Sequence, residues 1–474
     1  MRDGRWRDHI VTAIIAFVSS AFGVALIQGS QLMVDLIVGE DPEAAGMMGL
    51  AVQSVAWVFI GIGAYTAAVV TANTFSTIVA GRVREIAQLR LLGATSGSLQ
   101  RRLALEGLAA GAVGAVAGWG AAIGAYRLIV ERAVADGTLP EPVPGAFGYT
   151  WIAPTSPMPA VFAILTVWIA AYLGSRAVAK VSPVQALSAT VEPPVERIAA
   201  GRGRTVAFWL LMGPGLLLLL GGCAIGAVSP LGVLVAFWGG VLSFTAVVVG
   251  AVRIVPQLVS WIGGLFGGSA SAALARGNAL RAPRATTRSV IGMIIGVALI
   301  VMFAVALATM RQVIWDYMIA QGGGAPTEED RMLFEQSMAT VTAVMIALVA
   351  VSAVLAAIGM ISNLALAVIQ RRRELGLLRA IGMDGGQVRS MILVESAVTA
   401  IVAIGFGAVL GLIYGWAGAQ STYGSVAGGV AMPVVPWALP VAIVVATTAL
   451  ALVAAIGPAA RATRVTPIEA LAVS

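Results

Sequence analysis

The chain alternates between long apolar runs and short segments that carry most of its charge. About 20 predominantly apolar residues are enough to cross a bilayer as a helix, and we identify ten such runs in the 474 residues. Two of them, 49–79 and 337–369, are longer than a membrane requires, so we expect these helices to continue beyond it. The ten predicted spans are 11–34, 49–79, 107–130, 158–175, 205–227, 230–252, 289–310, 337–369, 395–418 and 437–460.

The composition agrees with this pattern. Hydrophobic residues make up 59% of the chain, charged residues only 11%, and the mean hydropathy is +0.94. Soluble domains carry about 25% charged residues, and their cores stop growing at roughly 250–300 residues. An ordinary cytosolic enzyme is therefore excluded. We predict an all-α polytopic membrane protein whose helices pack closely, since 56 glycines are present and small residues let helix backbones approach each other.

The basic residues predict the orientation, because cytoplasmic loops are enriched in Lys and Arg. With the N-terminus inside, 25 of the 29 basic residues fall on the cytoplasmic side, whereas 12 of the 22 acidic residues fall outside. The net charge of +7 is then a topology signal and not a nucleic-acid footprint, so no nucleic-acid partner is expected. We predict a multi-pass protein of the bacterial plasma membrane, embedded in the lipid bilayer, with both termini cytoplasmic. The Lys-poor, Arg- and Ala-rich composition suggests the bacterial source.

The rarest residues exclude most catalytic chemistry. One histidine, His9, and one cysteine, Cys223, cannot assemble a zinc site or a Ser–His–Asp triad. A P-loop needs a lysine within a G-x-x-x-x-G-K-[ST] motif, and the single lysine, Lys180, follows Ala179 instead. We expect no catalytic, cofactor-binding or metal-binding residue in this chain. If the protein uses ATP, another subunit must bind it.

Two distant segments share one sequence pattern. Residues 82–94 (RVREIAQLRLLGA) align without a gap onto residues 371–383 (RRRELGLLRAIGM) at an offset of 289. An apolar run with spaced glycines follows each segment. The residues identical in both are Arg84, Glu85, Leu89, Arg90 and Gly93 in the first segment and Arg373, Glu374, Leu378, Arg379 and Gly382 in the second.

Shorter matches flank these segments. Residues 180–187 and 464–471 share a [Ser/Thr]-Pro capping pattern, which predicts a short helix after the fourth span of each half. A Gln-x3-Asp motif lies at the outer end of two predicted spans, where it either caps the helix end or lines a substrate vestibule. The residues of this motif are Gln31 and Asp35 in the first half and Gln312 and Asp316 in the second.

The matches predict three segments: a first four-span repeat (1–190), a linker with a two-span hairpin (191–274) and a second four-span repeat (275–474). Six spans precede the second repeat, so both repeats have the same orientation and are parallel. This disfavours secondary carriers built on inverted repeats.

The repeated segments predict a surface that docks a partner. In the coupling blocks 80–106 and 370–394, a basic helix with leucines along one side meets a glycine, which permits a sharp bend, and a second short helix leads back to the membrane. Ile86, Leu89 and Leu92 form that side in the first block. The alternative is a loop that only satisfies the positive-inside rule, but such a loop need not keep the Glu and the Gly of both blocks.

The pattern R-x-R-E-I-x-x-L-R-x-x-G-A, followed by a glutamate and a Gly-rich span, resembles the FtsX-like permease domain of MacB-type ABC transporters. The resemblance covers residues 1–190 and 275–474. It implies a duplicated ten-span permease without catalytic activity of its own. It also implies a separate ABC ATPase subunit, in two copies, that binds ATP and Mg²⁺ and docks on the coupling blocks. Many relatives carry a large extracytoplasmic domain after the first span, whereas the corresponding loops here, 35–48 and 311–336, are short.

The spans themselves bear on the substrate. No Asp, Glu, Lys or Arg lies in the middle of a predicted span, and such charges usually mark ion paths. We therefore expect an amphiphilic substrate, such as a lipid, a lipoprotein, a hydrophobic peptide or a lipophilic drug. One alternative is a regulatory protein that transmits motion to an extracytoplasmic partner. A membrane enzyme is the other, but none of the residue groups that it needs is visible.

Overall fold

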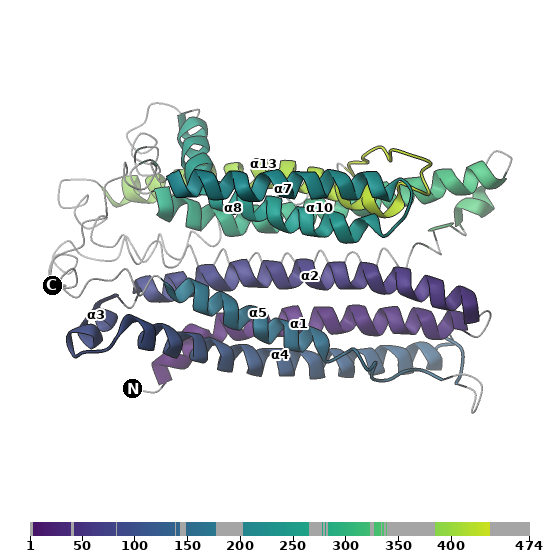
Figure 1. The fold of residues 1–474 in the computed structure, drawn as a ribbon, viewed down its shortest axis with the longest axis horizontal. Coiled ribbons are helices and arrows are strands. Elements are labelled where there is room, and N and C mark those ends of the chain that lie inside the picture. Colours follow the sequence, from purple (N-terminus) through teal and green to yellow (C-terminus); the bar gives the residue numbers. More distant parts are fainter. Residues whose placement is uncertain are drawn as a thin grey trace. The chain divides into compact units, whose positions relative to one another are not determined.

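The apolar runs fold as long helices. The computed structural model describes residues 3–38, 42–81, 83–137, 139–142, 148–176, 202–264, 277, 280, 283–322, 327–332, 334–335, 338 and 384–436. These residues form helices, turns and loops and contain no strand. The helices, shown in Figure 1, are α1 (Asp3–Val38), α2 (Pro42–Gly81), α3 (Val83–Leu91), α4 (Ser96–Ala135), α5 (Met158–Gly174), α7 (Arg202–Gly226), α8 (Gly232–Gly263), α10 (Pro283–Gly322) and α13 (Gly385–Tyr423).

Six of the described helices contain a stretch long and apolar enough to cross a membrane. Helices α2 and α5 carry shorter apolar stretches. The all-α polytopic fold is therefore confirmed. Eight of the ten predicted spans lie on described helices, while 337–369 and 437–460 lie outside the described residues. The six stretches are His9–Leu32, Ser96–Ala135, Gly203–Gly226, Gly232–Gly263, Val290–Gln321 and Ala397–Tyr423.

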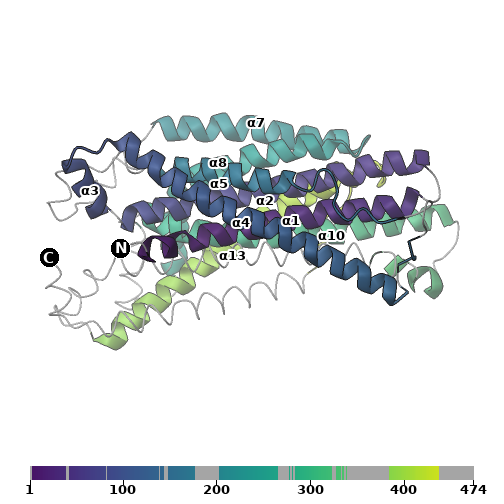
Figure 2. The same cartoon turned by 90° about the horizontal axis from the view of Figure 1, so that it is seen from below.

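The chain divides into two compact units, Met1–Thr190 and Val191–Ser474. In the first unit, α1, α2, α4 and α5 pack side by side as a bundle (Figure 1 and Figure 2). In the second unit, the α7–α8 hairpin packs on α10 and α13. The predicted connecting hairpin therefore shares a compact unit with helices of the predicted second repeat.

One prediction about the helices is wrong. Instead of a short helix followed by a separate span, α4 continues without a break from Ser96 to Ala135, and α13 continues from Gly385 to Tyr423. The reason is local: after Ser96 and Gly385 neither segment contains a proline, and every glycine in it has a helical backbone with no positive φ. A single rigid helix thus connects the turn after α3 with the opposite end of the unit.

Glycines set the contact between the two central helices of each unit. A Cβ on Gly114 or Gly118 of α4 would collide with the backbone carbonyl oxygen of Ala13 or Phe17 in α1. The same arrangement occurs between α13 and α10. There, added Cβ atoms would lie 2.9, 2.6 and 2.6 Å from the backbone oxygens of α10, at Gly407, Gly411 and Gly415 respectively.

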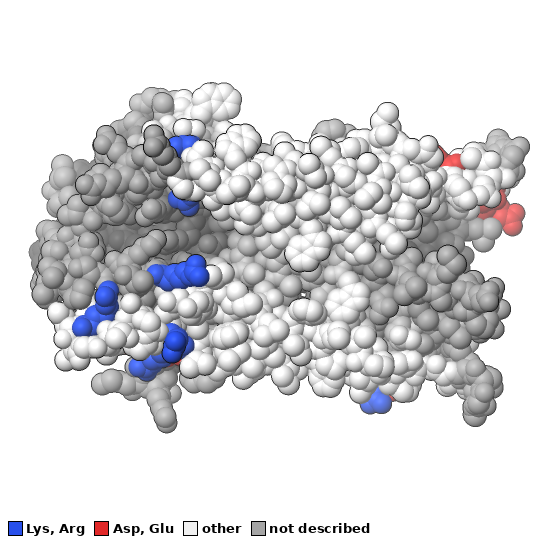
Figure 3. Space-filling view, in the orientation of Figure 1, with Lys and Arg blue, Asp and Glu red and all other residues white. Residues whose placement is uncertain are grey.

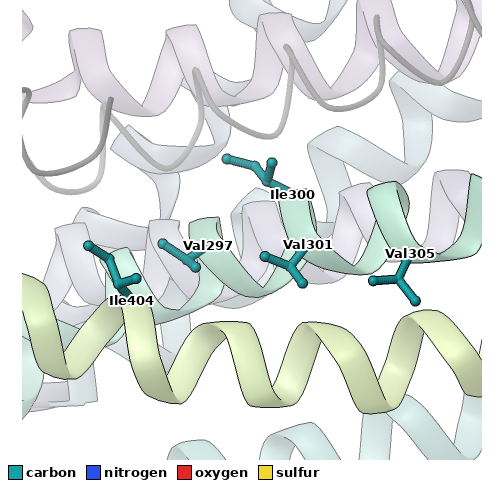
Figure 4. Close-up of a cluster of buried hydrophobic side chains, with 5 residues drawn as sticks. All are labelled: Val297, Ile300, Val301, Val305 and Ile404. Atoms are coloured by element: carbon teal, nitrogen blue, oxygen red, sulfur yellow. The ribbon is translucent and has the colours of Figure 1, made fainter. Parts of the chain in front are cut away.

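Branched side chains fill the space beside these glycines. Between α10 and α13, Val297, Val301, Val305 and Ile404 form a buried cluster together with Ile300 (Figure 4). Because helices in a bilayer gain little from burying apolar surface against each other, such close packing is the main source of their association.

Charge is confined to the ends of the helices. Between residues 396 and 423, α13 has no charged side chain, and between residues 205 and 252 the α7–α8 hairpin has none either. In Figure 3, the Lys, Arg, Asp and Glu side chains that are coloured lie toward the ends of each unit, taken by itself. This uncharged middle is what a hydrocarbon environment requires.

We predict that Gly114→Ala destabilises the first unit, because the new methyl group must push α4 away from the α1 backbone. The loss should be about 1–3 kcal/mol, as for other overpacked positions, and thermal unfolding in detergent would detect it. Gly120→Ala is the matched control, since no atom lies within 4 Å of a Cβ at that position. Equal stability of the two variants would contradict this account of the packing.

Candidate functional site

The α3–α4 hairpin has a rigid turn. Gly93 adopts a φ of 98°, in the left-handed region that favours glycine, as the sequence predicts. The turn is closed by the Ala94 N–H, which donates to the Leu89 carbonyl at 2.9 Å. The hydroxyl of Thr95 caps α4 by accepting from the Ser98 N–H at 3.2 Å. Local hydrogen bonds therefore hold the shape of the tip.

The apolar residues of the hairpin divide into two groups. Ile86 is buried with Leu99 and Leu103 of α4, and Leu89 packs against this cluster. Leu92, predicted to lie on the same side, belongs to the turn after α3 and is 84% exposed. The prediction for Leu92 is wrong, because α3 ends at Leu91 and the turn points the next side chain away from α4. Leu91 and Leu92 together form an exposed apolar tip, which we call the leucine tip.

The remaining predicted residues of the first block are placed as follows. Glu85 lies in the first turn of α3 with an exposed side chain, and Arg90 lies in the last turn, half-buried. The backbone of Arg84 belongs to α3, while its side chain lies outside the description. The corresponding residues of the second block also lie outside the described residues; they are Arg373, Glu374, Leu378, Arg379 and Gly382.

The described part of the second block begins at Asp384, which caps α13. Its carboxylate accepts from the Gly386 N–H at 3.1 Å, and the Gln387 side chain accepts from the Asp384 N–H at 3.1 Å. Asp384 follows Thr95 by 289 residues, so α4 and α13 begin at matching positions of the repeat. The signal for this, a Thr or Asp before a helix, is present in the sequence.

At the base of the hairpin, the only histidine of the chain meets a glutamate. His9 of α1 is 5% exposed, and its Nε2 lies 3.2 Å from Glu106 Oε2 on α4. The Arg102 Nε lies 3.4 Å from the other carboxylate oxygen. The His9 ring also faces Phe75 of α2, with 5.7 Å between the ring centroids. Sequence reasoning set His9 aside as a residue that could not form a catalytic or metal site and missed this contact.

At the opposite end of the first unit, a buried glutamine holds a loop. The Gln28 Nε2 donates to the Trp151 carbonyl at 2.9 Å, and the Ala153 N–H donates to Gln28 Oε1 at 2.8 Å. In the second unit, the Val434 N–H donates to the Thr309 hydroxyl at 3.1 Å. Both partners of this second bond follow their counterparts by 281 residues, which is also the offset of the Gln-x3-Asp motif.

The Gln-x3-Asp motif is partly described. Gln31 is half-buried, and the side chain of Asp35 lies outside the description. Gln312 donates to Asp316 within α10 at 2.8 Å. Gln312, but not Asp316, also lines a cavity of about 510 Å³.

This cavity combines an apolar wall with a polar rim. The Ala304, Leu307 and Ala308 side chains of α10 form the wall. On the rim, Arg311 makes an ion pair with Glu335 at 2.5 Å, and the rings of Trp315 and Phe334 lie 5.1 Å apart. Arg331 and Pro436 complete the lining. A molecule with an apolar part and a polar head would match both surfaces.

The short helical turn that carries Arg331 is capped by Asp330. This carboxylate accepts hydrogen bonds from the Thr327 hydroxyl and N–H at 2.7 and 2.9 Å. These bonds favour the ionised form and lower the pKa of Asp330. Asp330 is fully exposed and lies on the surface, so its role is to order this turn.

Within the described part of the chain, no group of three or more His, Cys, Asp or Glu side chains could hold a metal ion. A family model for the C-terminal domain of FtsX-like permeases matches residues 57–183 and 346–467. The two matched segments begin 289 residues apart and together cover more than half of the chain. The chain belongs to the FtsX-like permease family. A comparison with curated proteins found no match.

Members of the FtsX-like permease family are non-catalytic membrane components of the ABC-transporter type, and they normally partner with an ATPase subunit. The first matched segment of this permease contains the α3–α4 hairpin and Glu106, and the second contains the start of α13. The hairpin therefore belongs to the part of the chain that defines the family.

We predict that Gly93→Ala weakens the hairpin of this permease by about 1–2 kcal/mol, the usual cost of a left-handed backbone for a residue with a Cβ. Hydrogen exchange of residues 89–95 would measure the change. Gly97→Ala is the matched control, because Gly97 lies in the first turn of α4 with no atom within 4 Å of a Cβ. If both variants exchange alike, the positive φ is not what shapes the turn.

A second prediction concerns Gln28, whose side chain is fully buried. Gln28→Leu leaves the buried N–H of Ala153 without its acceptor, and a lost partner of this kind costs about 1–3 kcal/mol. Hydrogen exchange of residues 148–157 should increase, whereas the exposed-site control Gln88→Leu should leave it unchanged. Unaltered exchange in Gln28→Leu would show that other contacts hold the loop.

Proposed function

We propose that this protein is the transmembrane subunit of a MacB-type ABC exporter, and that its α3–α4 hairpin docks a separate ATPase subunit. The observation that carries the proposal is the leucine tip, two exposed leucines on a turn fixed by Gly93 and Thr95. A rigid apolar tip on a solvent-facing turn is typical of a protein–protein contact. The charged residues Arg84, Glu85 and Arg90 flank it and select the partner.

The duplicated ten-span form follows from the repeat. The offset of 289 residues between the predicted blocks is also the offset between the two matched family segments and between the caps of α4 and α13. The second block, residues 370–394, therefore docks a second copy of the ATPase. In this arrangement both hairpins and both termini lie in the cytoplasm, at the plasma membrane, and ATP and Mg²⁺ bind to the partner.

Force applied at the hairpin has a defined route. Helix α4 runs unbroken from the turn to Ala135, and its glycines hold it against the α1 backbone. When the ATPase moves the hairpin, α4 and α1 therefore move together through the membrane. The chain supplies no chemical step of its own.

The transported substrate is amphiphilic. The uncharged middles of the helices offer nothing to a polar ion, whereas the cavity lined by Gln312, Trp315 and Arg311 joins an apolar wall to a charged rim. This cavity serves as the vestibule from which an amphiphile in the outer leaflet leaves the membrane. An ATPase rate of the complex that no amphiphile changes, in reconstituted vesicles, would oppose this part of the proposal.

The docking role predicts that Leu92→Asp reduces co-purification of the ATPase subunit roughly tenfold or more, as expected when a central apolar anchor is lost. The measurement is a pull-down of the tagged permease from native membranes with quantification of the bound ATPase. Val228→Asp is the matched control, since Val228 is also 84% exposed in a helix-connecting turn. Undiminished ATPase in the Leu92→Asp sample would remove the hairpin from the docking surface.

A further inference from the structure

The His9–Glu106 contact joins three helices at the base of the hairpin. A carboxylate can only accept hydrogen bonds, so the His9 Nε2–H donates to Glu106, and the ring lies against Phe75 of α2. Glu106 is ten residues beyond the start of α4 at Ser96, which places it about 15 Å along the helix at 1.5 Å per residue. The contact thus fixes α1 and α2 to α4 where the hairpin leaves the bundle.

The packing register identifies the corresponding position in the second unit. In the first unit, Gly114 meets the Ala13 carbonyl, and His9 precedes Ala13 by four residues. In the second unit, Gly407 meets the Ile294 carbonyl, and the residue four positions before Ile294 is Val290. The offset of 281 that relates the loop-binding residues also leads from His9 to Val290.

The partner of His9 is replaced as well. Glu106 precedes Gly114 by eight residues, and the residue eight positions before Gly407 is Thr399. Val290 is fully buried and Thr399 is 9% exposed. The position of the His–Glu contact in the second unit is therefore a Val–Thr position, and a valine side chain can neither donate nor accept a hydrogen bond.

The difference matters mechanically. A hydrogen bond between a histidine and a carboxylate fixes both a distance and a direction, whereas apolar contacts are non-directional and permit small sliding. At the base of the first hairpin, α1 cannot rotate or slide on α4 without breaking this bond. At the corresponding place in the second unit, only packing opposes such motion.

We propose that the His9–Glu106 contact locks α1 to the base of the α3–α4 hairpin, so that the two halves of the permease transmit motion unequally. The first hairpin passes its displacement directly to the first turns of α1, while the second hairpin acts on α10 through packing alone. His9 is thus a positioning residue for energy coupling. This inference rests on the docking role proposed for the hairpin.

The decisive variant is the double substitution His9→Val with Glu106→Thr, which places the residues of the second unit in the first. In the complex purified with its ATPase and reconstituted in vesicles, the amount of bound ATPase should stay the same, because the leucine tip is intact. The ATP hydrolysis rate should fall at least fivefold. His9→Gln, which keeps an N–H donor, should restore the rate to within about twofold of wild type, and the second-unit control Thr399→Val should leave it unchanged.

A double variant that hydrolyses ATP at the wild-type rate with normal ATPase binding would overturn the lock. If instead no ATPase binds even to the wild type, the docking proposal fails, and a second measurement still tests the lock. Spin labels at Ile10→Cys and Leu105→Cys, two exposed positions beside the pair, in a Cys223→Ala background, should give a narrow distance distribution. The double variant, or Glu106→Gln where the double variant does not fold, should broaden it; an unchanged distribution contradicts the proposal.

Discussion

The close approach of glycines to a neighbouring backbone is the contact on which the rest of the structure depends. In a bilayer, lipid tails are as apolar as leucine, so helices associate through packing and hydrogen bonds. Gly114 and Gly118 bring α4 against α1, and Gly407, Gly411 and Gly415 bring α13 against α10. These contacts set the register of each helix pair. Every longer-range contact, including those at the two ends of the units, follows from that register.

The two units share a frame and differ at its ends. The loop beyond the first bundle is held by Gln28, and a backbone N–H at the matching position of the second unit binds Thr309. A single amide or hydroxyl is thus enough to fix each loop. At the hairpin base the repeat is not maintained, because a charged pair in one unit corresponds to Val290 and Thr399 in the other. Duplication supplied the frame, and single substitutions made the halves unequal.

The helices of the fold could be predicted because apolar length and capping residues are local signals. Gly93 could be identified as a turn residue for the same reason. The exposure of Leu92 could not, since helical periodicity assumes that α3 continues one residue further than it does. The His9–Glu106 contact spans 97 residues and the Gln28 contacts span more than 120. Such pairs depend on the register between helices, which glycine contacts determine and periodicity does not contain.

The central claim is that this permease contains no engine and transmits the work of a partner. Its most direct test is to isolate the tagged chain gently from native membranes and to measure the mass and ATP hydrolysis of the intact assembly and of the chain alone. The account predicts two copies of a P-loop ATPase per chain, with hydrolysis by the assembly and none by the isolated chain. An assembly without an ATPase, or hydrolysis by the chain alone, would contradict it.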